Sequence, residues 1–192
     1  MSLILSSNSP RRKQLLAGLG IPFEVRVLPD IDESYPHDLP VEDIPVFIAN
    51  EKAQAYRSLI QPDDLVITAD TVVVLDNRIL GKPKDADEAA AMLRALSGRT
   101  HRVITGVCIS GLEVQRAFAV ISHVTFKDLE EEEIAYYIDH YKPFDKAGAY
   151  GIQEWIGYIG VTGLQGSYFN VMGLPVQRIY EELKSLGLNL LQ

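Results

Sequence analysis

Two arginines near the start of the chain, Arg11 and Arg12, follow a Ser-Asn-Ser-Pro segment. Ser9 is a favourable N-cap and Pro10 suits the first turn of a helix, so we expect a helix to begin at Pro10. The unpaired N–H groups of a helix start attract anions, and a guanidinium binds phosphate oxygens through a planar fork. With the hydroxyl of Ser7 close by, this segment is suited to hold a chain of phosphates. The alternative is an ordinary capped helix with two solvated arginines.

An aspartate follows a continuous apolar run. Residues 65–69 predict a buried strand that ends on Asp70, and the ends of strands in α/β sheets commonly carry ligand sites. A carboxylate at this place can hold a divalent cation or accept a proton from an attacking water. The alternative is a turn-forming aspartate. Thr71, the next residue, is either an ordinary β-branched strand residue or a hydroxyl directed at a ligand.

A second acidic segment, with Asp30, Asp32 and Glu33, follows a predicted strand over residues 23–28. One of these carboxylates either joins a metal site or, like its neighbours, is solvated. Glu51 has the same two interpretations, a second metal carboxylate or a surface charge. Carboxylates that gather from separate segments are what a divalent cation requires, so the tertiary structure must decide between them.

Two lysines are placed so that an ammonium could meet an anion. Lys52 lies on a predicted helix over residues 45–59, among small alanine side chains that allow another element to approach closely. Lys82 stands between Gly81 and Pro83; glycine frees the backbone and proline restricts it, which indicates a tight turn. Taken alone, each lysine is also explained as a solvated surface charge.

The segment over residues 145–153 is rich in glycine and alanine, which suits close packing against a flat ligand. Gln153, at its end, carries an amide that both donates and accepts hydrogen bonds, as needed to read the edge of a base. The alternative is a structural amide that pairs with backbone groups.

The elements that must position these residues alternate between strand and helix patterns. Strands are expected over residues 3–6, 23–28, 65–69 with an extended continuation over 71–75, 78–80, 100–110 and 114–126, and helices over 10–20, 45–59, 85–96, 130–141 and 176–186. This order predicts an α/β or α+β architecture around a mixed sheet. A chain of 192 residues suits one large domain or two small lobes that share a cleft.

Composition excludes several classes of protein. An apolar content of 47% is enough for a sizeable core and argues against disorder, and the net charge of −8 argues against a broad nucleic-acid surface. Cys108 is the only cysteine and stands in an apolar run, so we expect a buried, inert thiol. The sequence has no apolar segment long enough to cross a bilayer and no secretory pattern at its start, which favours the cytoplasm.

Two common chemistries lack their sequence motifs. The chain has no Gly-x-Ser-x-Gly elbow and no dinucleotide fingerprint that opens a helix, and its four histidines have no metal-ligand spacing. Acyl transfer and hydride transfer therefore have little support.

Taken together, these segments resemble the Maf family of nucleoside triphosphate pyrophosphatases. The matching segments occur in order over nearly the whole chain: residues 7–12 (SNSPRR), 32–33 (DE), 51–53 (EKA), 69–73 (ADTVV), 81–83 (GKP), 97–101 (SGRTH), 145–153 (DKAGAYGIQ), 166–168 (GSY) and 173–175 (GLP). Each segment is short, and their common order makes the resemblance specific.

The resemblance implies a fold and an activity. The fold would be a single Maf-like domain over residues 1–192, α/β in class, with a central mixed sheet flanked by helices and two lobes around a cleft, similar to the inosine-triphosphatase-like (Maf/HAM) proteins. The activity would be hydrolysis of a nucleoside triphosphate to the monophosphate and pyrophosphate with a divalent metal, Mg²⁺ or Mn²⁺. The Tyr-Gly-Ile-Gln form resembles the branch that acts on dTTP and UTP rather than on 7-methylguanosine triphosphate.

The resemblance also implies roles for particular residues. The aspartate that matches Asp70 is the proton acceptor in the family, and the positions that match Arg11, Thr71 and Gln153 are associated with substrate choice. Such an enzyme would clear or adjust the nucleotide pool, with normal or modified pyrimidine triphosphates as substrates.

We combine these features into one mechanism. The two arginines and Ser7 bind the triphosphate, and Lys52 and Lys82 neutralise charge as the bond to pyrophosphate breaks. Asp70 binds the metal, orients the attacking water, or does both, with help from Glu33. The mechanism requires that cations far apart in the sequence converge on one polyphosphate.

A rival hypothesis is that the protein binds the same ligand without hydrolysing it. A non-hydrolytic nucleotide- or RNA-binding regulator of septum formation would use the same cations to hold a ligand, and a nucleotidyl-handling enzyme would need a second substrate. For partners, we expect a small-molecule nucleoside triphosphate, neither a membrane nor a nucleic acid, and a homodimer if the long strands present an open edge.

Overall fold

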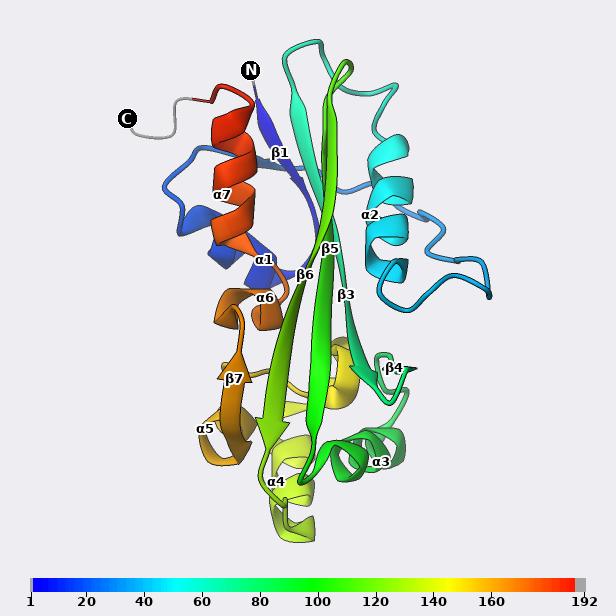
Figure 1. Ribbon diagram of the computed structural model, residues 1–192, viewed down its shortest axis with the longest axis vertical. Helices are drawn as coiled ribbons and strands as arrows, with labels where there is room; N and C mark the ends of the chain where they lie inside the picture. Colours follow the sequence, from blue (N-terminus) through cyan, green and yellow to red (C-terminus); the bar gives the residue numbers. More distant parts are fainter. Residues whose placement is uncertain (1, 189–192) are drawn as a thin grey trace. The chain divides into compact units, whose positions relative to one another are not determined.

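The structure is a computed structural model that describes residues 2–188 (Figure 1). The chain forms two compact units. Within the described residues, unit 1 comprises residues 2–70, 105–120 and 173–188, and unit 2 comprises residues 71–104 and 121–172. The expected single domain over the whole chain and the expected cleft between two lobes stay predictions.

The strands of the described residues form one mixed sheet. They are β1 (Leu3–Ser6), β2 (Glu24–Val25), β3 (Leu65–Leu75), β4 (Arg78–Leu80), β5 (Thr100–Ser110), β6 (Gln115–Phe126) and β7 (Val161–Gln165). Their hydrogen-bonded order is β2-β1-β3-β5-β6-β7, with β4 paired to β3. β1 is parallel to β2 and β3, whereas β3 with β4 and β6 with β7 are antiparallel. The mixed sheet expected from the sequence is confirmed.

Helices separate most of the strands. They are α1 (Pro10–Ala17), α2 (Ile44–Gln54), α3 (Ala86–Leu96), α4 (Glu131–Tyr141), α5 (Trp155–Gly160), α6 (Tyr168–Met172) and α7 (Val176–Ser185), with short 3-10 helices η1 (Pro143–Asp145) and η2 (Ala147–Ala149). The α/β class is therefore confirmed. Among the described residues, every helix is too short or too polar to span a membrane.

Unit 1 places helices on both sides of its strands, with α1 and α7 on one side and α2 on the other (Figure 1). The start of α2 approaches the backbone of β5 closely at Gly106, where an added Cβ would lie 2.2 Å from the carbonyl carbon of Pro45. Only glycine allows this contact, which brings α2 against the sheet. On the other side, the guanidinium of Arg178 from α7 lies over the ring of Phe118 in β6.

The buried hydroxyl of Tyr56 joins two parts of unit 1. It donates to the carbonyl of Arg26 (2.7 Å) and accepts from the backbone N–H of Leu28 (3.0 Å) and from the hydroxyl of Ser6 (2.8 Å). These bonds explain why β2 is shorter than the strand expected over residues 23–28. Arg26 N still donates to Leu5 O of β1, but the carbonyl of Arg26 and the N–H of Leu28 bond to the Tyr56 hydroxyl instead of to a strand.

The helix expected over residues 45–59 also ends earlier, at Gln54. Beyond that point the chain makes backbone bonds between residues three apart, from Tyr56 N to Ala53 O and from Leu59 N to Tyr56 O. The α-helix thus gives way to tighter turns that carry Tyr56 into the core. Lys52 accordingly lies in the last turn of α2.

Unit 2 has its own apolar core, in which α3 packs against α4 and η2. The core contains buried residues from strands β3–β6, helices α3–α5 and the segment after η2, among them Val73, Leu93, Leu96, Val103, Phe126, Ile134, Tyr137, Tyr150 and Ile156. At Gly148, with φ of 69°, an added Cβ would lie 3.0 Å from both methyl groups of Val73. A glycine is therefore required where η2 passes β3.

Candidate functional site

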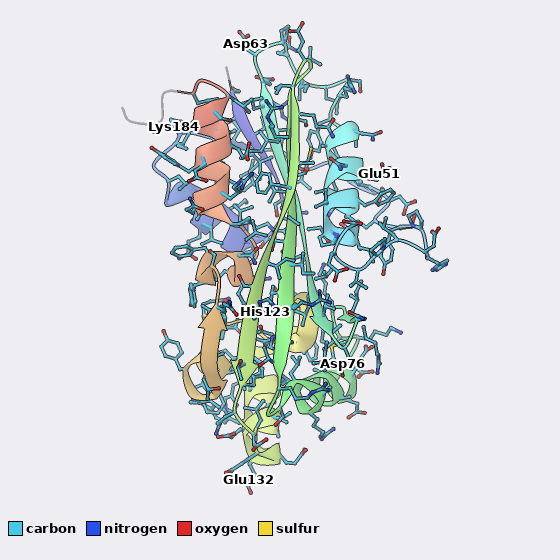
Figure 2. All side chains as sticks on the ribbon, in the orientation of Figure 1. Glu51, Asp63, Asp76, His123, Glu132 and Lys184 are labelled. Atoms are coloured by element: carbon cyan, nitrogen blue, oxygen red, sulfur yellow. The ribbon has the colours of Figure 1, made fainter. Side chains whose placement is uncertain are left out.

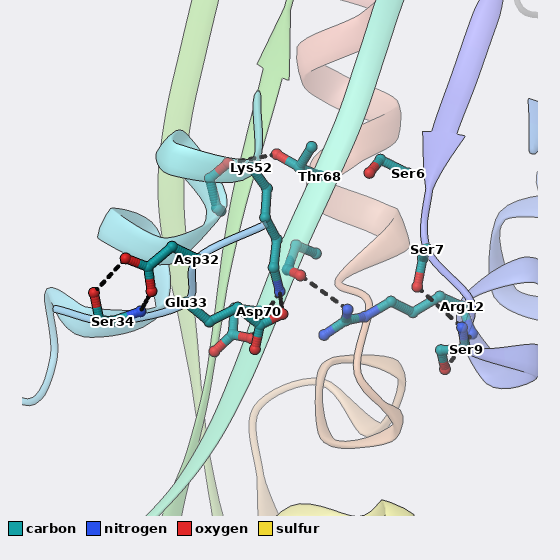
Figure 3. A network of polar contacts seen from close by, with 12 residues as sticks. Ser6, Ser7, Ser9, Arg12, Asp32, Glu33, Ser34, Lys52, Thr68 and Asp70 are labelled. Atoms are coloured by element: carbon teal, nitrogen blue, oxygen red, sulfur yellow. Dashed lines mark hydrogen bonds and ion pairs between the residues drawn. The ribbon is translucent and has the colours of Figure 1, made fainter. Parts of the chain in front are cut away.

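The centre of the site in unit 1 is an ammonium between two carboxylates. Lys52 Nζ lies 2.8 Å from Glu33 Oε1 and 3.2 Å from Asp70 Oδ1 (Figure 3). The lysine side chain is 12% exposed and that of Asp70 17% exposed, so water screens their attraction only in part. Helix α2, strand β3 and the loop after β2 thus bring together three residues that the sequence singled out.

Asp70 lies inside a strand, which differs from the strand end expected from the apolar run. β3 continues without a break from Leu65 to Leu75. Its parallel neighbour β1 ends at Ser6, opposite Thr68, so Asp70 lies just beyond the end of that neighbour. The carboxylate therefore stands at the carboxyl edge of the parallel pair, where ligand sites form, although its own strand goes on.

The pleat of β3 determines which side chains share a face. Thr68 donates its hydroxyl proton to the carbonyl of Ala49 in α2 at 2.7 Å, and Asp70 contacts Lys52 of the same helix. Because side chains alternate along a strand, Thr71 points to the opposite face from Asp70. Asp70 and Thr71, which the sequence assigned to one site, therefore lie on opposite faces of the sheet.

The start of α1 confirms the predicted cap. Ser9 accepts a hydrogen bond from the N–H of Arg12, and Ser7 Oγ accepts one from the N–H of Ser9 at 3.2 Å. Ser7 is buried and shapes the turn between β1 and α1. The helix begins at Pro10 as expected and ends at Ala17.

Arg12 approaches Asp70 from the side of the sheet opposite to Lys52 (Figure 3). Its guanidinium donates to the carbonyls of Ala69 (2.8 Å) and Gly173 (2.8 Å). Burial lowers the pKa of Arg12, and the nearby charge of Asp70 opposes that shift. Arg12 thus links strand β3 to the segment before α7 through these two hydrogen bonds. Its positive charge interacts favourably with the carboxylate of Asp70.

The other acidic residues that the sequence singled out lie in different surroundings. Asp32 accepts hydrogen bonds from both the N–H and the hydroxyl of Ser34, each at 2.8 Å, and so closes a local turn. Glu51, one position before Lys52, lies on the outer side of α2 (Figure 2). Of these carboxylates, Glu33 is the one that meets Lys52.

Lys82 and Gln153 belong to unit 2. Lys82 is exposed on the loop after β4, and the carbonyl of Gly81 accepts a hydrogen bond from Gly148 N at 3.0 Å. This bond ties the lysine loop to the small-residue segment that leads to Gln153. The convergence of Lys82 with the cations of unit 1 on one phosphate chain stays a prediction.

The amide oxygen of Gln153 is buried, and none of the described residues donates a hydrogen bond to it. A buried amide oxygen without a donor destabilises the protein by about 1–3 kcal/mol. Such an atom is suited to accept a hydrogen bond from a ligand. The structural interpretation, an amide that satisfies backbone groups, does not describe this oxygen.

Three polar residues of unit 2 were not singled out by the sequence: Tyr137, Lys146 and Glu154. Lys146 Nζ lies 3.1 Å from Glu154 Oε1, and the hydroxyl of Tyr137 donates to Glu154 Oε2. Lys146 and Glu154 flank the small-residue segment, but Tyr137 lies on a helix pattern typical of a core position. Nothing local in the sequence indicates that its hydroxyl is used.

A family model described as "Maf-like protein" matches residues 2–186. The chain belongs to the Maf family. A relative from Phocaeicola vulgatus called "dTTP/UTP pyrophosphatase" is 62% identical over 184 residues, covering 96% of this chain and 95% of the relative. A relative of the same name from Porphyromonas gingivalis strain W83 is 58% identical over 187 residues, with 96% and 94% covered.

A solved structure supports the fold of this Maf chain. The Ham1 protein of Staphylococcus aureus has a TM-score of 0.51 at 13% sequence identity, covering 97% of this chain and 100% of that one. The Maf/HAM type of fold expected from the sequence is therefore confirmed. Glu33, Lys52, Asp70 and Gln153, which were assigned from short segments, all lie within the matched range.

Proposed function

We propose that this Maf chain is a nucleoside triphosphate pyrophosphatase that hydrolyses dTTP and UTP to the nucleoside monophosphate and pyrophosphate. The observation that carries the proposal is Lys52 between Asp70 and Glu33, with the buried charge of Arg12 beside Asp70. A partly buried carboxylate next to fixed cations is the arrangement that phosphoryl chemistry needs. The names of the two relatives support the choice of substrates.

In the proposed reaction, water breaks the bond between the α- and β-phosphoryl groups. The water oxygen bonds to phosphorus as Asp70 takes the proton. On attack at the α-phosphorus, pyrophosphate leaves with the electron pair of the broken bond, and on attack at the β-phosphorus the nucleoside monophosphate leaves with it. Attack at either phosphorus yields the same two products. Lys52 holds the Asp70 carboxylate in place and, with Lys82, stabilises the charge that develops on the leaving oxygens.

A divalent cation, Mg²⁺ or Mn²⁺, fits this donor set. Asp70 and Glu33 supply carboxylate oxygens, the ligands that these cations prefer, and one oxygen of each contacts Lys52. Among the described residues, no three His, Cys, Asp or Glu side chains form a cage for an ion, and substrate phosphates commonly complete the shell of Mg²⁺. Asp70 and Glu33 would hold the cation, which supplies neutralisation of the phosphate charge.

We assign the start of α1 to binding the phosphates of the substrate. Arg11 and Arg12 supply guanidinium groups, and the helix N-terminus supplies its partial positive charge. Ser7, which caps the turn before the helix, supports their placement. The family resemblance associates the positions of Arg11 and Thr71 with substrate choice, and we assign both residues that role.

We assign Gln153 to recognition of the substrate's base. Uracil and thymine present a donor at N3 beside an acceptor at O4, and the unpaired Gln153 oxygen accepts from N3–H while the amide nitrogen donates to O4. Cytosine has an acceptor at N3 and a donor at C4, so both bonds are lost and two polar groups stay mispaired. A site of this kind discriminates strongly against the wrong base.

The test is pyrophosphate release from a panel of nucleoside triphosphates with Mg²⁺ or Mn²⁺. We expect release from UTP and dTTP and its loss in Asp70→Asn, with Asp63→Asn, on an exposed loop of unit 1, as the control that keeps activity (Figure 2). Saturable binding without product indicates instead the nucleotide-binding regulator. Release that requires a second substrate indicates a nucleotidyl-handling enzyme.

The cytoplasm is the proposed place of action, because it holds the nucleoside triphosphate pool. A homodimer also stays a prediction. β6 pairs with β7 through residues 123–126, so the earlier part of β6 has one strand neighbour within the described sheet. This open edge supports the expected dimer, and sedimentation of the purified chain tests it.

A further inference from the structure

The turn over residues 151–154 holds Gln153 at its third position. Its backbone closes through a hydrogen bond from Glu154 N to Gly151 O at 3.0 Å. Helix α5 begins directly after Glu154, and its Gly157 approaches so closely that an added Cβ would lie 1.8 Å from the carbonyl oxygen of Ile152. The turn is therefore packed tightly on the side of α5.

The hydroxyl of Tyr137 forms hydrogen bonds with both ends of this turn. Tyr137, buried in α4, accepts a hydrogen bond from Gly151 N at 3.0 Å and donates its proton to Glu154 Oε2. Burial, together with the bond to Glu154, raises the pKa of Tyr137. The hydroxyl consequently keeps its proton, and remains a donor, at neutral and mildly alkaline pH.

The other oxygen of Glu154 is held by a buried lysine. Lys146 Nζ lies 3.1 Å from Glu154 Oε1 and 2.7 Å from Asp145 Oδ1, and its side chain is 9% exposed. Glu154 is thus fixed at both oxygens by groups from α4 and from the segment between η1 and η2. A buried ion pair with added hydrogen bonds is a means of specifying one conformation.

The amide of Gln153 depends on this turn for its position. Among the described residues, no hydrogen bond to the amide oxygen is found, and the amide nitrogen lies 2.9 Å from where a Cβ on Gly151 would stand. The same Cβ would lie 3.1 Å from Lys146 Cε and from the carboxyl carbon of Glu154. Packing around Gly151, rather than a direct polar contact, sets where the amide lies.

We infer that Tyr137, Glu154 and Lys146 are positioning residues that aim the Gln153 amide and thereby set the preference for uracil and thymine over cytosine. The inference rests on the proposed role of Gln153 in reading the base. A network that fixes the turn determines the direction of the unpaired oxygen, and a displacement of about 1 Å is enough to weaken a directed contact strongly.

The test compares Tyr137→Phe, which removes only the hydroxyl, with Tyr141→Phe as a control. Tyr141 lies one turn later on α4, stacked on Tyr137, with an exposed side chain. For each variant, kcat/KM is measured by pyrophosphate release from UTP and from CTP, below the measured Tm. We expect the UTP-to-CTP ratio to fall about tenfold in Tyr137→Phe, mainly through KM for UTP, and to stay unchanged in Tyr141→Phe.

An equal loss for both nucleotides would mean that Tyr137 has a merely structural role and would overturn the inference. If Tyr137→Phe does not fold, Glu154→Gln, which keeps the side-chain shape and removes the charge opposite Lys146, is measured in the same way with the same criterion. In the double variant of Tyr137→Phe with Gln153→Ala, we expect the ratio of Gln153→Ala alone, because the two residues act through one contact. Additive losses contradict that coupling.

Two further measurements distinguish a failure of this inference from a failure of the proposed function. If Gln153→Ala leaves the UTP-to-CTP ratio unchanged, the base-reading role itself is wrong. Binding of UMP and CMP, measured by calorimetry, does not require turnover. If the protein releases no pyrophosphate yet prefers UMP, and Tyr137→Phe removes that preference, the hydrolytic proposal fails while the inference stands; no change in preference refutes the inference.

Discussion

Lys52 Nζ lies 3.2 Å from Asp70 Oδ1, although one residue lies in the last turn of a helix and the other within a strand. The contact exists because Gly106 lets α2 approach the sheet and because Thr68, two residues before Asp70, bonds to the same helix. The packing of α2 therefore places the ammonium at the carboxylate. A helix that sat farther from β5 would separate the ammonium of Lys52 from the carboxylate of Asp70.

Replacement of Lys52 should damage activity more than stability. In Lys52→Met, the developing charge on the leaving oxygens loses a fixed cation, and we expect kcat/KM for UTP to fall about a hundredfold. Lys52→Arg should retain part of the activity because it keeps the charge with a different geometry. Lys184→Met, on the exposed end of α7, is the control (Figure 2). Wild-type kinetics in Lys52→Met would remove this lysine from the mechanism.

His101 should make the protein less stable in mild acid. Burial lowers the pKa of His101 to about 4 from its usual 6.5, and its Nε2 contacts the hydroxyl of Tyr150 at 2.7 Å. Between these two values the unfolded chain binds a proton that the folded chain does not, so stability falls as pH drops below about 6.5. From pH 7.5 to pH 5, this histidine should cost the wild type about 2 kcal/mol of unfolding free energy.

Urea unfolding of the wild type and of His101→Asn at the two pH values measures this effect. The variant should lose about 2 kcal/mol less than the wild type over the same interval. His123→Asn, which replaces an exposed histidine on β6, should follow the wild type. Equal pH dependence in His101→Asn and the wild type would show that His101 is not buried in its neutral form.

Gly106→Ala should strongly destabilise unit 1. The new methyl group would lie 2.2–2.4 Å from backbone atoms of Pro45 and Val46, and backbone cannot move aside as a flexible side chain can. We expect a loss of about 3 kcal/mol in urea unfolding. Gly81→Ala is the control, because an added Cβ there has no described atom within 4 Å and should change stability by less than about 0.5 kcal/mol. Similar values for both variants would contradict the close approach of α2.

Cys108 should be unreactive in the folded protein. The thiol is buried in unit 1 with Ala49 and Ala53, and burial raises its pKa to about 11. A reagent for thiolates, such as Ellman's reagent at pH 8, should therefore label the native protein very slowly and label one thiol per chain in urea. Rapid stoichiometric labelling without denaturant would disprove the expected inert thiol.

Local patterns in the sequence predicted the elements well where their causes are local. Ser9 and Pro10 start α1, and Asp85 caps α3 by accepting a hydrogen bond from Glu88 N. The two long strands β5 and β6 match their expected ranges closely. Where a distant group competes for the backbone, as Tyr56 does after Val25, the expected strand is cut short.

By itself, the sequence determined the chemical types and the family resemblance: which cationic residues are predicted to bind phosphate, which aspartate follows the apolar strand, and which glutamine ends the small-residue segment. Tertiary structure alone decided that Glu33 rather than Asp32 meets Lys52, and that Tyr137 holds the turn around Gln153. Caps and periodicity act over a few residues, whereas these contacts join groups that only the packing of helices on the sheet brings within hydrogen-bond distance.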